Sequence, residues 1–397
     1  MTSSWQTKAI GEVLRVVNGG TPKTGDPRYW DGDHQWITPA EMGRLETPYL
    51  SSSRRALTNA GLRVAAELVP ENSIILSSRA PIGHLVINAV PMAFNQGCKG
   101  LVPTAVIDTK FAYYFLLSNI DLLESLGTGA TFKELSSGKL KEVPITFPSF
   151  DEQQRIVGIL DEAFAGIATA KANAEKNLKH ARAIFDSHLQ SIFESGRWQC
   201  KGLSVLCETF ADGDWIESKD QSANGVRLVQ TGNVGRGVFK DRGHKARYVS
   251  DATFKRLKCT EIFAGDCLVS RLPDPVGRSC LIPETGKRMI TAVDCTIVRF
   301  NPELVEPEFF IYYSQSQDYL KAVDSATTGT TRNRISRSNL GQVQIPVPSR
   351  PDQNRIVCEL DALANETQRL ESLYQRKLAA LDALKQSLLH QAFSGQL

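Results

Sequence analysis

The fold is decided by the stretch Phe147-Pro-Ser-Phe-Asp-Glu-Gln-Gln-Arg-Ile-Val-Gly-Ile-Leu-Asp161, which returns 200 residues later as Val347-Pro-Ser-Arg-Pro-Asp-Gln-Asn-Arg-Ile-Val-Cys-Glu-Leu-Asp361. Further identities follow on both sides at the same offset, without a gap. The beginning of the unit also recurs, because a Trp-Gln pair stands at 5–6 and again at 198–199. A repeat of this length predicts two copies of one structural unit within the chain.

Each copy of the stretch leads into a long apolar stripe with helical spacing. The residues of this stripe are Ile156, Leu160, Ala163, Ile167, Ala170 and Ala174 in the first copy, and Ile356, Leu360, Leu363, Leu370, Tyr374 and Leu378 in the second. The pattern predicts spacer helices over 148–196 and 348–397, each about 60 Å long at about 1.5 Å per residue. Such a narrow stripe needs a long partner, so we expect the two helices to pair along their length. The alternative is one helix of a bundle inside each domain.

The remaining residues form two globular domains, which we place at 1–147 and 197–347. They match each other only in outline, and strand-like runs such as 291–299 alternate in them with short helices such as the one predicted at 109–118. The fold class is therefore α+β (mixed α/β), with two domains separated by two long helices in a pseudo-twofold internal repeat. Similar scaffolds with different sequence between similar ends are expected of two modules that recognise different targets.

The net charge of +3 hides an uneven distribution of charge along the chain. Residues 218–300 carry 15 Lys and Arg against 8 Asp and Glu, whereas the two spacer segments are close to neutral. Within 236–258, eight cations face only two carboxylates and are mixed with glycines and aromatic residues, which suits contact with a phosphate backbone. The alternative is an ordinary solvated surface. The neutral helices suit contacts with protein better than contacts with DNA.

Candidate DNA contacts follow from side-chain chemistry, since Arg and Lys can bind guanine edges and Gln and Asn can bind adenine edges. In the first domain the candidates are Thr21, Lys23, Arg28, Thr38, Arg79, Gln96, Lys99 and Lys133. In the second domain they are Gln230, Asn233, Arg236, Arg242, Lys245, Arg247, Arg271, Arg332 and Arg334. The loops 127–133 and 328–334 combine small hydroxyl residues with cations, which suits phosphate oxygens. The alternatives are a strand-end turn at 95–97 and plain connectors for the two loops.

Signatures of catalysis are missing from the sequence. It contains no Walker A motif, no Gly-x-Ser-x-Gly and no His-Glu-x-x-His, and Asn301-Pro302-Glu303-Leu304 lacks the second proline and the aromatic residue of amino-methylating enzymes. We therefore expect a non-catalytic binding protein. Cys259, Cys267, Cys280 and Cys295 could form a zinc site, but buried thiols are the simpler interpretation. No signal peptide and no apolar run of about 20 residues are found, which favours the cytoplasm and no membrane contact.

Several motifs resemble those of the specificity subunit of type I restriction-modification systems. They are Gly19-Gly-Thr-Pro22, Trp36-Ile-Thr-Pro-Ala-Glu-Met42, Asn95-Gln-Gly97 and the repeated stretch at 148–157 and 348–357. The resemblance implies two target-recognition domains that each bind one half of a bipartite, asymmetric site in double-stranded DNA. It also implies an antiparallel coiled coil between them. The second half differs, because Ala211-Asp-Gly-Asp-Trp215 stands where Gly-Gly-Thr-Pro would be, so the contacts of the first loop are not transferred to it.

The same resemblance implies partners in the cytoplasm of a prokaryote. Two modification subunits, which bind S-adenosylmethionine and methylate adenine at N6, are expected to dock on the helices. Restriction subunits, which hydrolyse ATP and use Mg²⁺, complete the nuclease, so this chain itself holds no cofactor. The expected docking residues on the helices are Arg155, Ile156, Leu160, Arg355, Ile356 and Leu360. A fused DNA enzyme and a scaffold for two protein-binding modules remain as alternatives.

Overall fold

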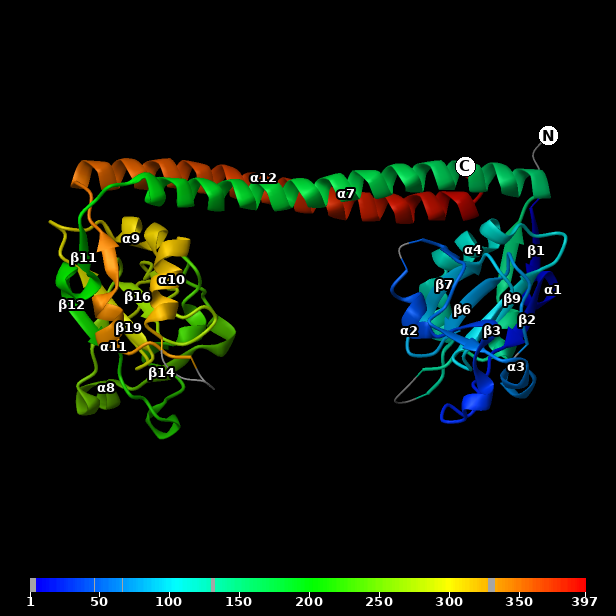
Figure 1. Cartoon of the computed structure of the whole chain (residues 1–397), viewed down its shortest axis with the longest axis horizontal. Coiled ribbons are helices and arrows are strands. Elements are labelled where there is room, and N and C mark those ends of the chain that lie inside the picture. Colours follow the sequence, from blue (N-terminus) through cyan, green and yellow to red (C-terminus); the bar gives the residue numbers. More distant parts are fainter. Residues whose placement is uncertain (1–4, 46, 66, 130–132, 328–332) are drawn as a thin grey trace. The chain divides into compact units, whose positions relative to one another are not determined.

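The computed structural model describes residues 5–45, 47–65, 67–129, 133–327 and 333–397. The chain forms two compact units (Figure 1). Unit 1 comprises residues 1–174 together with 376–397, and unit 2 comprises residues 175–375. Each unit therefore contains one globular domain and part of each long helix.

Unit 1 combines a five-stranded sheet in the order β2-β9-β6-β7-β4, a three-stranded sheet in the order β5-β3-β8, and the antiparallel pair β1-β10. Its strands are β1 (Gln6–Ala9), β2 (Leu14–Asn18), β3 (Trp30–Ile37), β4 (Tyr49–Leu50), β5 (Arg55–Leu57), β6 (Ile74–Ser78), β7 (Ile82–Asn88), β8 (Met92–Phe94), β9 (Cys98–Pro103) and β10 (Pro144–Phe147). Its helices before the spacer are α1 (Ile10–Val13), η1 (Pro27–Tyr29), α2 (Pro39–Met42), α3 (Asn59–Ala65), α4 (Thr109–Ser118), α5 (Ile120–Leu126) and α6 (Ser137–Glu142).

Unit 2 repeats this plan with two four-stranded sheets, in the orders β12-β19-β16-β17 and β14-β13-β18-β15, and with the antiparallel pair β11-β20. Its strands are β11 (Cys200–Gly202), β12 (Cys207–Asp212), β13 (Val226–Val229), β14 (Arg247–Val249), β15 (Glu261–Ile262), β16 (Cys267–Ser270), β17 (Ser279–Leu281), β18 (Met289–Thr291), β19 (Cys295–Phe300) and β20 (Gln344–Pro346). Its helices are η2 (Leu203–Leu206), η3 (Ser218–Asp220), η4 (Thr231–Asn233), η5 (Gly243–Lys245), α8 (Asp251–Leu257), α9 (Pro307–Tyr313), α10 (Gln317–Ser325) and α11 (Arg337–Gln342).

The two spacer helices are α7 (Phe150–Ser195) and α12 (Arg350–Phe393), with 46 and 44 residues. In unit 2, Arg182 pairs with Glu371 and His188 pairs with Glu359 further along α7, so the helices run antiparallel there. In unit 1 the Lys171 ammonium lies 2.7 Å from the carboxylate of Asp382. The predicted fold class and the pairing of two long helices are confirmed, whereas the alternative of a separate bundle helix in each domain is wrong.

One glutamine fixes each spacer helix to its own domain, and it belongs to the repeated stretch. The completely buried Gln153 accepts a hydrogen bond from the Asp108 N–H at 2.8 Å and donates to the carbonyls of Val106 and Pro148. Gln353 makes the corresponding three bonds, to the Glu306 N–H and to the carbonyls of Leu304 and Pro348. The repeated glutamine is therefore a structural anchor, because its buried amide joins main-chain groups of the domain to the start of the helix.

The predicted helix at 109–118 is confirmed as α4, which the Asp108 side chain caps by accepting from the Phe111 N–H at 2.9 Å. The predicted strand over 291–299 is wrong in its first part. The chain turns over 292–294, because the Cys295 N–H donates to the Ala292 carbonyl, and β19 begins only after that turn. This turn contributes to the candidate site described below.

The four cysteines considered for zinc are buried, and burial raises their thiol pKa values, to about 12 for Cys280 and about 11 for Cys295. Throughout the part of the chain that the structure describes, no group of three or more His, Cys, Asp or Glu side chains could hold a metal ion. In the same residues, no helix is both long and apolar enough to cross a bilayer.

Candidate nucleic-acid interface

In unit 1 the loop after β2 lies against the turn that joins β8 to β9. The Gly19 N–H donates to the Cys98 carbonyl at 3.3 Å, and the Gly20 N–H donates to the Phe94 carbonyl at 3.0 Å. A Cβ on Gly19 would lie 2.1 Å from the Asn95 carbonyl oxygen, so only glycine allows this approach. The motifs around Gly19 and Asn95, which stand about 75 residues apart in the sequence, therefore lie next to each other.

The side chains at this edge contact one another. The Thr21 hydroxyl accepts from the Asn95 side-chain amide at 2.8 Å and donates to the side-chain amide oxygen of Gln96. Arg79 reaches the same turn, because its N–H donates to the Gly97 carbonyl. Five predicted contact residues thus gather here, and we call them the first-domain cluster: Thr21, Thr38, Arg79, Gln96 and Lys99.

Charges within the first-domain cluster are partly compensated. The Arg79 guanidinium lies 3.1 Å from the Glu134 carboxylate. Lys99 is buried on β9, and this burial lowers its pKa. The Thr38 N–H and hydroxyl both donate to the Glu41 carboxylate, at 3.1 and 2.9 Å, which closes the turn after β3. The cluster therefore presents neutral polar groups together with Arg79, whose charge is paired with a carboxylate, while the Lys99 cation is buried.

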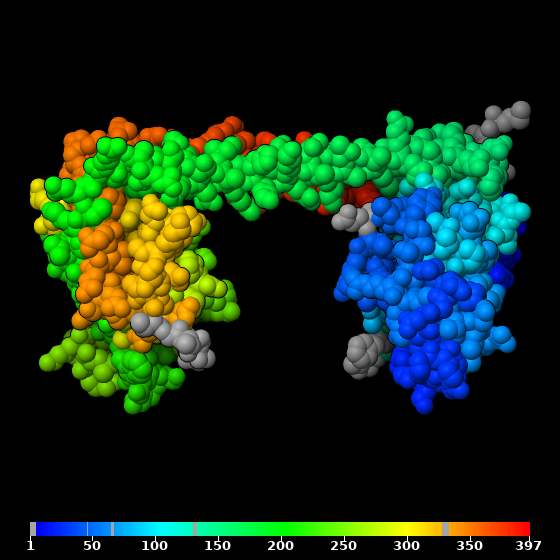
Figure 2. Space-filling view, in the orientation of Figure 1, coloured from blue at the N-terminus to red at the C-terminus, as the bar shows by residue number. Residues whose placement is uncertain are grey.

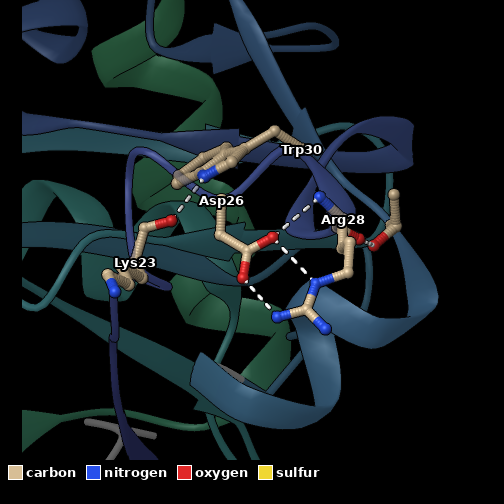
Figure 3. A network of polar contacts seen from close by, with 5 residues as sticks. Lys23, Asp26, Arg28 and Trp30 are labelled. Atoms are coloured by element: carbon tan, nitrogen blue, oxygen red, sulfur yellow. Dashed lines mark hydrogen bonds and ion pairs between the residues drawn. The ribbon is translucent and has the colours of Figure 1, made fainter.

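Lys23 and Arg28 lie outside the first-domain cluster: Lys23 in the loop that leads to η1, and Arg28 in η1 itself (Figure 3). The Trp30 indole N–H donates to the main-chain carbonyl of Lys23 at 3.2 Å. The Lys23 side chain is exposed. The Arg28 guanidinium makes two bonds to the Asp26 carboxylate and holds the pKa of that carboxyl below its ordinary value. Figure 2 shows blue residues from the first part of the chain on the surface of unit 1, at the end away from α7. Lys133 is also exposed.

In unit 2 the predicted basic segment forms a pocket of about 420 Å³, which we call the basic pocket. Its lining residues are Gln230, Gly232, Asn233, Arg242, Lys245, Ala246 and Arg247. Asn233 shapes it, because its side chain accepts from the Gln230 N–H and donates to the Lys240 carbonyl, both at 2.9 Å. β14, which contributes Arg247 to the lining of the basic pocket, lies at the end of unit 2 away from α7 and α12 (Figure 1).

The other predicted contacts of unit 2 lie apart from the basic pocket. Arg236 donates to the Gln315 carbonyl at 2.6 Å. Arg271 is buried and donates to the Val293 carbonyl at 2.5 Å. Arg334 pairs with Asp294 at 3.0 Å. Arg332 lies outside the described residues.

Arg278 was not among the predicted contacts, although it is buried beside the basic pocket and holds the neighbouring loops together. This buried guanidinium donates to four carbonyls, and it ties η4 to the loop that precedes β17. The accepting residues are Thr231, Val234, Leu272 and Pro275, at 2.6 to 3.0 Å. A single Arg in a strand-like run carries no signal of such a role, because the accepting carbonyls come from two distant loops.

The two units share one main-chain arrangement, which we call the shared frame. In unit 2 the Gly213 N–H donates to the Cys295 carbonyl at 2.9 Å and the Asp214 N–H donates to the Thr291 carbonyl at 2.8 Å, as Gly19 and Gly20 do in unit 1. The turns also correspond, because the Ala292 N–H donates to the Val229 carbonyl and the Cys295 N–H to the Ala292 carbonyl. The segment that departs from Gly-Gly-Thr-Pro in sequence therefore keeps its backbone.

The shared frame assigns counterparts that sequence comparison could not. Trp215 stands in unit 2 where Thr21 stands in unit 1, and Val293 stands where Gln96 stands. Gln230 follows β13 as Thr38 follows β3. One backbone thus carries different side chains at the same edge of the two domains.

Of the predicted docking residues, Ile156, Leu160, Ile356 and Leu360 are buried in the cores of their units. Arg155 and Arg355 are exposed and form ion pairs on their own helices. Arg155 lies 2.7 Å from the Glu152 carboxylate, and Arg355 lies 3.8 Å from the Glu359 carboxylate. The polar faces of α7 and α12 remain at the surface.

A duplicated domain with a constant frame and variable edge residues defines a two-module recognition protein. The family model described as the type I restriction modification DNA specificity domain matches residues 2–180 and again residues 196–377. The chain belongs to this family and carries the domain twice, which confirms the predicted membership.

Similar proteins of known class agree with this assignment, one of them over nearly the whole chain. The type I restriction enzyme MjaIX specificity subunit of Methanocaldococcus jannaschii is 24% identical over 416 residues, which cover 99% of this chain and 93% of the relative. The EcoR124I/EcoR124II specificity subunit of Escherichia coli is 35% identical over 163 residues, 39% of this chain and 40% of its own length. The fold is also similar to that of a chain in a solved structure that concerns complex assembly and conformational transition of the type I R-M system. The TM-score is 0.80 at 18% identity, over 99% of this chain and 98% of that chain.

Proposed function

We propose that the chain is the DNA-binding specificity subunit of a type I restriction-modification complex, in which each domain binds one half of a bipartite duplex site. The observation that carries this proposal is the shared frame with different edge side chains. An unchanged backbone can present two sets of base-contacting groups at equivalent positions, which is what a site with two unlike halves requires.

The chemistry of the two edges differs in a way that DNA recognition can use. The first-domain cluster offers hydroxyl and amide groups, which suit hydrogen bonds to base edges in the major groove. The basic pocket of unit 2 offers Arg242, Lys245 and Arg247 beside the amide of Gln230. Cations of this kind hold phosphates and fix the register, whereas a glutamine can bind an adenine edge.

The chain acts without catalysing a reaction, and the chemistry belongs to its partners. Two modification subunits, which bind S-adenosylmethionine, dock on the exposed polar faces of α7 and α12, including Arg155 and Arg355. Restriction subunits that use ATP and Mg²⁺ complete the assembly in the prokaryotic cytoplasm. The support for these partners is membership of the family together with the long exposed helices.

Methylome sequencing of a host that expresses the chain with its modification subunits tests the proposal. The expected product is one methylated motif with two specified halves and an unspecified gap. Gln96→Ala should relax base choice in one half only, and Gln230→Ala should relax it in the other half only. Gln6→Ala, at an exposed position of β1, is the matched control and should leave the motif unchanged. A continuous motif, or both halves relaxed by either variant, would exclude one domain for each half-site.

A further inference from the structure

Trp215 is the most conspicuous side chain that the assignments above leave unused. It is 71% exposed, although an indole is among the largest apolar groups in proteins. Its exposure does not result from a loose loop. The Asp214 N–H donates to the Thr291 carbonyl, and the Asp214 carboxylate accepts from the Thr260 N–H at 3.0 Å. On the other side, Ile216 packs on the apolar cluster that contains Val226.

Both neighbours of Trp215 are thus anchored while the indole itself points to solvent. The indole also helps to lower the pKa of Glu217, after the larger effect of Lys219, so its polar N–H edge lies toward that carboxylate. The apolar rings are left without a described apolar partner. An exposed aromatic side chain on an anchored main chain suits contact with another molecule, because little backbone freedom is lost on binding.

The place of Trp215 in the shared frame indicates what it contacts. In unit 1 the corresponding pair is Thr21 and Gln96, two polar side chains that touch each other. In unit 2 the pair is Trp215 and Val293, and both are apolar. Among the base edges in the major groove, the apolar feature is the 5-methyl group of thymine. The exchange of a polar for an apolar pair therefore changes the kind of base edge that fits.

We propose that Trp215 is a specificity-determining residue of the second domain and that its rings pack on a thymine 5-methyl group in the second half-site. This inference rests on the proposed function and deepens it. It predicts at least one A·T pair among the specified bases of that half-site. Val293 occupies the neighbouring frame position, where its N–H donates to the Asp214 carbonyl at 3.0 Å.

The test replaces each thymine of the second half-site by uracil, which lacks only the methyl group, and measures the affinity of the full chain in its assembled complex. For the unaltered chain, one replacement should weaken binding about fourfold, the value of one buried methyl group. In Trp215→Ala the same replacement should have no effect, and in Trp215→Phe the effect should be partly retained. Val205→Ala alters another exposed apolar side chain of the unit and should respond like the unaltered chain.

The outcomes separate this inference from the function on which it rests. If no uracil replacement weakens binding, or if Trp215→Ala responds as the unaltered chain does, the role of Trp215 is overturned while DNA recognition stands. A second half-site without an A·T pair would also overturn it. If the unaltered chain does not prefer its methylated site to unrelated duplex, the proposed function itself fails, and this inference fails with it.

Discussion

Replacement of Gln153 by Leu tests whether the repeated glutamine fixes the spacer helix to its domain. Leucine keeps nearly the same volume in this completely buried site but removes three hydrogen bonds. The Asp108 N–H and the carbonyls of Val106 and Pro148 then lose their partners. Because a buried unpaired polar group costs about 1–3 kcal/mol and two of these three groups are only partly buried, we expect a loss near the lower bound, about 3 kcal/mol, in the stability of unit 1.

Hydrogen exchange measured segment by segment is the suitable assay, because it reports local stability in each unit separately. Gln153→Leu should lower amide protection in α4 and in the first turns of α7, and it should leave α9 unchanged. Gln353→Leu should show the reverse. Gln154→Leu, which changes an exposed neighbour, is the control. Protection in Gln153→Leu within about 0.5 kcal/mol of that control would refute the anchoring role, since changes of this size are typical of surface positions.

Three further predictions concern binding, stability and assembly. Reversal of charge at Arg242, Lys245 and Arg247 should weaken binding to all duplexes and lower the slope of log affinity against log salt by about 3, without relaxing any single base, as anisotropy titrations can show; unchanged affinity at low salt would exclude backbone contact. Lys99→Met should raise the melting temperature near pH 7, because burial lowers the lysine pKa and the folded chain bears the cost of the charge. This gain should shrink as pH rises toward about 10.4, where the unfolded lysine also becomes neutral, and a gain that is constant with pH would contradict it. Ala174→Pro should break α7 at a cost of about 3 kcal/mol or more and abolish co-purification with modification subunits; co-purification that survives would argue against docking through α7.

The spacer helices were predictable because their signal is local and repeated. An apolar residue every three or four positions determines a helix stripe wherever the stripe is buried, and α7 and α12 follow it closely. The strand over 291–299 was not predicted correctly, since the turn at 292–294 is held by hydrogen bonds to Asp214, which follows β12, and to Val229 in β13. Residues this far apart in sequence leave no periodic pattern that would indicate the turn.

Part of the candidate site was also predictable from local sequence. The motifs around Thr21 and Gln96 were recognisable from their side chains, and the fold brings them together. Trp215 was not predicted, because the shared frame is made by the backbone. The sequence requirement of the frame in unit 2 is Gly213, where an added Cβ would lie 2.4 Å from the Ala292 carbonyl oxygen. Side-chain comparison cannot detect a site whose common feature is the path of the main chain.

The central claim is that two recognition domains on one pair of helices bind two half-sites at a set spacing. Its most direct test is the methylated motif of a chain with four residues inserted near the end of α7, at 194–196. Four helical residues add about 6 Å, and a base pair adds about 3.4 Å, so the unspecified gap should lengthen by one or two base pairs. The specified bases of both halves should stay the same. An unchanged gap at full activity, or altered half-site bases, would contradict the account.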